Sequence, residues 1–230
     1  MTTKNNSWRQ YVFLASMVGC IQFVLLTFIA MLFYPGGTHD DPTTTSYSFF
    51  SNFFSDLGLT VSPSGETNTV TFFLFILSLT LAGLAITLFF LACPALFKNT
   101  PGRIPSQLGS IVGVFSGLSY TGIAFTPADL YLEWHGNFVL LAFNSFLLVV
   151  VLYTIAIFLN KEYPNRYAII YLVFAVLLAA YLWLLFAGPN DIRIQATGQK
   201  VIVYAEIICM GTQAYGAWNV EKSRPTTFAA

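Results

Sequence analysis

Residues 11–34 read YVFLASMVGCIQFVLLTFIAMLFY, a run without a charged side chain that decides the class of the fold. A helix of about 20 apolar residues crosses the ~30 Å hydrocarbon core of a bilayer. The run is too long for the apolar part of a signal peptide, and no small-residue cleavage pattern follows it. We therefore predict that it is a permanent transmembrane helix.

Further segments along the chain have the same character. Of the 230 residues, 56% are hydrophobic and 9% are charged, whereas a soluble domain carries about 25% charged residues. These features predict an all-α integral membrane bundle of six transmembrane helices, forming one domain over residues 1–230. The formal net charge of zero gives no sign of nucleic-acid binding. The predicted spans are 11–34, 69–97, 105–126, 136–159, 167–187 and 200–219.

The third and sixth spans are the least apolar of the set. Gly109, Gly113 and Gly117 recur at four-residue spacing in the third span, which puts small residues on one helix face and permits close packing. Glu206 and Gln213 lie in the sixth span. We therefore expect the sixth helix to face protein rather than lipid on that side.

The basic residues predict the direction of the chain through the membrane. Apart from Arg193 and Lys200, every Lys and Arg falls in the two tails or in the second and fourth loops, which all lie on one side. Short loops rich in Lys and Arg remain in the cytoplasm. Both termini are therefore expected on the cytoplasmic side.

The first outer loop contains apolar residues at helical spacing. They predict an amphipathic helix near residues 46–57 that lies in the outer membrane interface or packs over the bundle as a lid. Either position directs Asn52 and Asp56, on the other face, away from hydrocarbon. The apolar positions are Phe49, Phe50, Phe53, Phe54 and Leu57.

Glu206 is the foremost candidate for a functional residue. It lies about 9 Å below the outer end of the sixth span, at 1.5 Å per residue. A carboxyl group at that depth is costly unless it is paired, protonated or in a watery cavity, and Arg193, Lys200 and His135 are candidate partners. Asn144 in the fourth span is expected at a similar depth. These residues predict a polar pocket that opens to the outer side.

Asp129 and His135 lie in the short outer connection before the fourth span. Imidazole and carboxylate groups bind metals, but their spacing here matches no metal motif, so neither a metal nor a cofactor is expected. The residues predicted to bind a ligand are Asn52, Asp56, Asp129, His135, Asn144 and Glu206.

The order of the outer-face motifs resembles a known family. The segments NFFSDLG (52–58) and FTPAD (125–129), followed by His135, resemble the domain of unknown function 998 over roughly residues 10–220. The resemblance implies a six-helix bundle of a prokaryotic plasma membrane, with Asp56, Asp129 and His135 facing outward, and no known activity. A weaker likeness exists to the Frag/DRAM/Sfk type of six-helix proteins.

Three functions are compatible with these features. The first is the binding of a lipid or small amphiphile in the outward-facing pocket, or service as an accessory subunit, with membrane lipids and other membrane subunits as partners. The second is an intramembrane hydrolase or transferase acting on lipid head groups, which requires Asp56, Asp129, His135 and Glu206 to converge. The third is a small transporter or channel, with polar residues along the sixth span marking its path.

Overall fold

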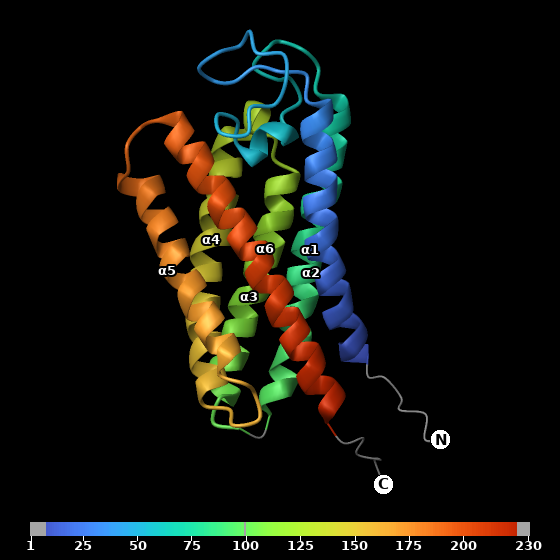
Figure 1. Cartoon of the computed structure of the whole chain (residues 1–230), viewed down its shortest axis with the longest axis vertical. Coiled ribbons are helices and arrows are strands. Elements are labelled where there is room, and N and C mark those ends of the chain that lie inside the picture. The colour runs from blue at the N-terminus through green and yellow to red at the C-terminus, as the bar shows by residue number, and fades with distance from the viewer. Residues whose placement is uncertain (1–7, 99, 225–230) are drawn as a thin grey trace.

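The computed structural model describes residues 8–98 and 100–224, and this part of the chain is helical between its loops. Six long helices run side by side (Figure 1), joined by loops that include two short 3₁₀ helices. The long helices are α1 (Trp8–Phe33), α2 (Thr69–Ala92), α3 (Arg103–Ala124), α4 (Ala128–Phe158), α5 (Arg166–Ala187) and α6 (Ile192–Ser223), and the 3₁₀ helices are η1 (Phe54–Gly58) and η2 (Cys93–Phe97).

Four segments are long and apolar enough to cross a membrane: α1, α2 together with η2, α4 and α5. They fit a membrane-embedded protein. Their outward side chains are apolar, as Ile21 and Phe28 of α1 and Val176 of α5 show by their exposure. Helices that are apolar on the outside as well as the inside suit a lipid environment. Helices α3 and α6 are less apolar, as the sequence predicts.

The helices form a closed ring. Each long helix packs against the one before and the one after it, and α6 returns to pack against α1. At one end of the bundle, Arg9 of α1 and Glu221 of α6 form an ion pair with an N–O distance of 2.8 Å. The described beginning and end of the chain therefore lie side by side at the same end of the bundle.

Glycine allows α2 and α3 to approach closely. A Cβ atom built on Gly117 would lie 2.7 Å from the carbonyl oxygen of Gly83, and one built on Gly113 would meet the ring of Phe90. Real Cβ atoms do not come this near to backbone oxygen, so the contact requires glycine. The small-residue face predicted for the third span is therefore a packing surface.

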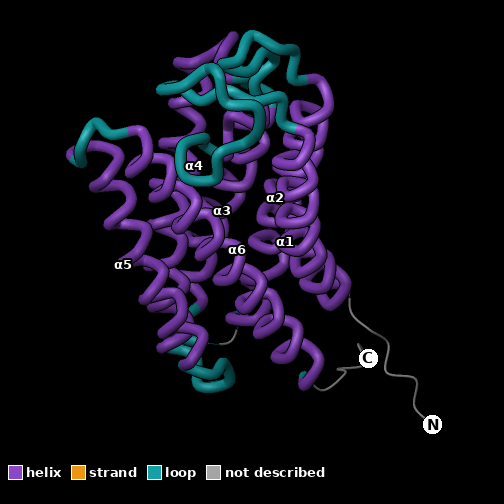
Figure 2. Tube along the Cα trace, turned by 45° about the horizontal axis from the view of Figure 1, so that its top comes forward, coloured by secondary structure: helices purple, strands orange, loops and turns teal. Residues whose placement is uncertain are grey.

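The prediction of an amphipathic helix near residues 46–57 is wrong. Turns occupy most of this segment, and only η1 is helical there. The side chain of Asn52 accepts a hydrogen bond from the Ser48 amide, and that of Asp56 accepts one from the Phe53 amide, each at 2.9 Å. Asn and Asp compete with helix in this way by bonding nearby backbone groups. Figure 2 shows the resulting loops gathered over one end of the helices.

Candidate functional site

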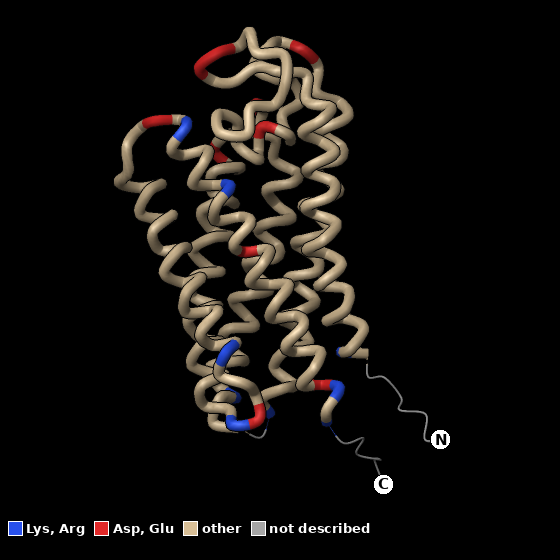
Figure 3. Tube along the Cα trace, in the orientation of Figure 1, with Lys and Arg blue, Asp and Glu red and all other residues tan. Residues whose placement is uncertain are grey.

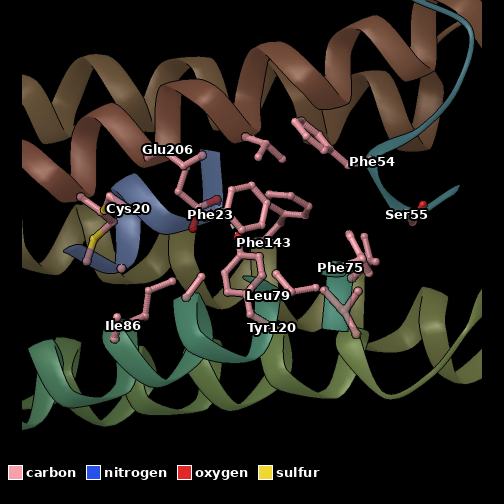
Figure 4. Close-up of a pocket in the computed structure, with 18 of the residues that line it drawn as sticks. Cys20, Phe23, Phe54, Ser55, Phe75, Leu79, Ile86, Tyr120, Phe143 and Glu206 are labelled. Carbon is pink, nitrogen blue, oxygen red and sulfur yellow. Dashed lines mark hydrogen bonds between the residues drawn. The ribbon is translucent and has the colours of Figure 1, made fainter. Parts of the chain in front are cut away.

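A cavity of about 100 Å³ lies inside the ring, beneath η1. Helices α1, α2, α3, α4 and α6 contribute to its wall, and Phe54 and Ser55 of η1 lie at one end of it (Figure 4). Most of its surface is apolar and much of it is aromatic. The aromatic residues of the wall are Phe23, Phe54, Phe75, Tyr120, His135 and Phe143.

Glu206 is the carboxylic acid of this wall. Its side chain extends from α6 toward the cavity (Figure 4), and the residue is only 6% exposed. The hydroxyl of Tyr120 on α3 donates a hydrogen bond to Glu206 Oε2 at 2.6 Å. Glu206 Oε1 has no hydrogen-bond partner among the described residues, although it is buried. One oxygen of this cavity-lining carboxyl group is thus left unsatisfied by the described residues.

The position of Glu206 along the bundle differs from that of most other acidic and basic residues. Figure 3 shows that acidic and basic residues otherwise gather at the two ends of the bundle. A carboxyl group between apolar helices loses its hydration, and an unmade hydrogen bond at such a depth costs about 1–3 kcal/mol or more. The expectation that Glu206 faces protein rather than lipid agrees with its burial.

His135 of α4 also lines the cavity. Its Nδ1 lies 2.7 Å from the backbone carbonyl oxygen of Thr126. A carbonyl oxygen only accepts, so Nδ1 carries the proton and Nε2 of the neutral ring carries the lone pair. His135 therefore offers an acceptor, like Glu206.

Asn52 and Asp56 belong to a hydrogen-bond network in the loop between α1 and α2, which covers the cavity. Asn52 Nδ2 donates to Asp56 Oδ2 and to the Gly37 carbonyl oxygen, both at 2.9 Å. His39 Nε2 lies 3.6 Å from Asp56 Oδ1. The hydrogen-bonding contact with Asp56 and the negative charges of Asp56 and Asp40 raise the pKa of the half-exposed His39, although partial burial opposes this. The network fixes the loop that covers the cavity.

Lys200 ties the same loop to α6. The residue is 1% exposed, and its ammonium group donates a hydrogen bond to the Asn52 carbonyl oxygen. The rings of Tyr47, Phe49 and Phe54 surround it, with centroids 5.3, 5.3 and 5.6 Å from Nζ. Cation–π attraction at these distances offsets part of the lost hydration. The sequence suggested Lys200 as a partner of Glu206, but the structure joins it to the loop.

Asp129 and Asn144 lie on the surface, away from the cavity wall. Asp129 Oδ2 accepts hydrogen bonds from the amides of Thr60 and Val61 at 3.0 and 3.2 Å. Asn144 Nδ2 donates to the Leu140 carbonyl oxygen, one turn earlier on α4, at 2.8 Å. Asp129 thus anchors a loop, and Asn144 is satisfied within its own helix.

The predicted site residues therefore occupy three places: Asn52 and Asp56 in the loop network, His135 and Glu206 on the cavity wall, and Asp129 and Asn144 on the surface. Within the described residues, no three His, Cys, Asp or Glu side chains are arranged to hold a metal ion. Tyr120, the partner of Glu206, was missed, because nothing in the sequence distinguishes it among the 12 tyrosines.

Two further polar residues inside the bundle hold helices together. Gln22 Nε2 donates to the Ser78 carbonyl oxygen at 2.9 Å, joining α1 to α2. Gln213 Nε2 donates to the Tyr167 carbonyl oxygen at 2.8 Å, joining α6 to α5. Such bonds between apolar helices stabilise their packing.

Comparison with known proteins finds no family model, curated protein or solved structure that matches this chain. The resemblance to the domain of unknown function 998 stays a prediction.

Proposed function

We propose that this protein binds a small amphiphile inside its helix bundle, in the cavity in front of Glu206. The observation that carries the proposal is Glu206, a buried residue in the wall of an apolar cavity, whose Oε1 lacks a hydrogen-bond partner among the described residues. Buried polar atoms are almost always satisfied, so an exception needs a reason. A ligand that donates to this oxygen and covers the apolar wall supplies one.

The size of the cavity limits the occupant. An apolar cavity of about 150 Å³ holds a benzene molecule, and this one measures about 100 Å³ but is not fully enclosed, so a single ring would extend into its opening. A complete phospholipid does not fit into such a space. The bound part is a single ring or a short chain, either as a whole molecule or as the end of a longer one.

The same proposal includes six membrane spans with both termini in the cytoplasm. Helices α3 and α6 contain 22 and 32 residues, which at 1.5 Å per residue are long enough to cross ~30 Å. The polar residues that lower the hydropathy of α6 are buried, including Lys200, Glu206 and Gln213. They therefore do not expose charge or amide groups to lipid.

Filling the cavity tests the proposal. Ala82 of α2 lines it, whereas Ala179 of α5 is exposed on the outside of the bundle. Toluene or another single-ring compound is expected to raise the melting temperature of the wild-type protein in lipid nanodiscs. A ligand that binds only the folded state stabilises that state. Ala82→Leu should abolish the gain and Ala179→Leu should preserve it. Equal gains in both variants would mean that the compounds act elsewhere, and the proposal would be withdrawn.

A further inference from the structure

We infer that the natural ligand of this cavity carries an amine, so that an ammonium group meets Glu206 while a small apolar body fills the remaining space. This inference rests on the proposed function and specifies the chemical class of the ligand. It follows from the polar groups of the cavity wall, from their charge and from the aromatic rings around them.

The donor groups of Tyr120, Ser16 and His135 in the cavity wall already form hydrogen bonds within the protein. The Tyr120 hydroxyl donates to Glu206 Oε2 at 2.6 Å, and the Ser16 hydroxyl donates to the Val12 carbonyl oxygen at 2.9 Å. The proton of neutral His135 is on Nδ1, which faces the Thr126 carbonyl oxygen. The remaining capacity near Glu206 is therefore that of an acceptor, Glu206 Oε1, and His135 Nε2 is a second acceptor of the wall. The Ser55 hydroxyl and Gln199 Nε2, donors for which no hydrogen-bond partner is found among the described residues, lie at the η1 end of the cavity. Acceptors select a ligand that donates.

The charge of the wall selects the same kind of ligand. The described residues that line the cavity include the carboxylic acid Glu206 and no Lys or Arg. Lys200, the cation of the neighbouring loop contact, is already bonded to the Asn52 carbonyl oxygen and enclosed by aromatic rings. An anionic head group would thus enter a site without a counter-charge. An ammonium group would form a charge-assisted hydrogen bond with Glu206 Oε1, which is stronger than a neutral one.

The aromatic walls suit a cation beside an apolar group. Phe23 and Phe143 lie near Glu206 in the cavity, and Tyr120 approaches from the opposite helix (Figure 4). The faces of such rings attract ammonium groups, most strongly where water is excluded. The rings also supply apolar surface for the rest of a small molecule. A carboxylate oxygen without a partner and an aromatic wall are independent features that favour the same ligand.

Four compounds of nearly equal shape test whether the cavity prefers an amine: benzylamine, benzyl alcohol, toluene and benzoate. They share a ring and differ in the group that would meet Glu206. Their affinities are measured from the ligand-dependent melting temperature of the protein in nanodiscs. Benzylamine is expected to bind at least about tenfold more tightly than benzyl alcohol, because its ammonium group adds an attraction between opposite charges that the neutral hydroxyl lacks. Benzoate is expected to bind most weakly of the four.

Two variants of the wall assign the preference to Glu206. Glu206→Gln should lower benzylamine affinity to that of benzyl alcohol and leave toluene binding intact, and toluene binding also shows that the variant is folded. Tyr120→Phe removes the donor to Oε2 but retains the carboxyl group, so it should keep the preference for the amine.

The results also separate this inference from the proposal on which it rests. If no compound binds in a manner that Ala82→Leu abolishes, the proposed function fails. If toluene or benzoate binds the cavity as tightly as benzylamine, or if Glu206→Gln keeps the preference for the amine, the cavity binds small molecules but the amine assignment is overturned.

Discussion

The backbone amide of Phe54 donates a hydrogen bond to Gln199 Oε1 at 2.7 Å, which joins η1 to α6 across 145 positions of the sequence. Both residues line the cavity. The hydrogen bond therefore ties the loop that covers the cavity to the helix that carries Glu206.

Gln199→Leu should loosen this closure. The substitution leaves the buried Phe54 amide without an acceptor, which costs about 1–3 kcal/mol. Hydrogen exchange of the amides in residues 52–58 should accelerate about tenfold or more. Thr197→Val is the matched control on the same helix, because it removes only a 3.5 Å bond to the Phe50 carbonyl oxygen at the surface. Equal exchange in the two variants would contradict the fastening role of Gln199.

Lys200→Met should release the loop further while keeping an unbranched side chain in the same space. The Asn52 carbonyl oxygen loses its donor, and the rings of Tyr47 and Phe49 lose the cation between them. We expect faster proteolysis in the loop between α1 and α2 at unchanged helix content by circular dichroism. Arg193→Met, an exposed change on the same helix, should leave proteolysis as in the wild type.

Protonation of His39 should stabilise the loop between α1 and α2. The contact with Asp56 raises the pKa of His39, so the folded loop favours the protonated ring. This stabilisation is complete below the ordinary pKa of about 6.5 and is lost as the pH rises through the higher folded value. The melting temperatures of wild type and His39→Gln should differ most at acidic pH and converge at alkaline pH. If the difference in melting temperature between the two proteins grows with pH, the predicted upward shift of the His39 pKa is contradicted.

Gly117→Ala should destabilise the bundle, because the added Cβ meets the carbonyl oxygen of Gly83. Overpacking of this kind costs about 1–3 kcal/mol. Gly136→Ala on α4 is the control, since its Cβ would have no neighbour within 4 Å. Melting temperatures in nanodiscs compare the two variants, and a smaller loss for Gly117 than for Gly136 would refute the close α2–α3 contact.

The helices were predictable because long apolar runs have few alternatives. The run 11–34 anticipates α1 to within a few residues, and the weak hydropathy of the third and sixth spans corresponds to α3 and α6. The loop after α1 was not predictable from spacing. Its phenylalanines imitate a helical stripe, whereas the side chains of Asn52 and Asp56 bond backbone groups and turn the chain instead.

The site was predictable only in part, for a similar reason. Burial of a carboxyl group in a membrane helix is a strong constraint, so Glu206 could be placed in the interior from its position in the sequence. The side of α4 on which the Asn144 side chain lies depends on the rotation of the helix about its axis. An almost uniformly apolar sequence does not reveal this rotation. The pairing of Tyr120 with Glu206 depends on the relative height of two helices, which only their packing determines.

Closure of the ring between α1 and α6 has a consequence for the order of assembly. The ribosome makes α1 before α6, so the face of α1 that packs against α6 stays uncovered until α6 has been made. A nascent chain that stops after α5 contains the aromatic residues of the wall but not Glu206. The proposed contact between an amine and Glu206 would therefore form only after α6 has joined the bundle, and such a ligand would help to hold that helix in place.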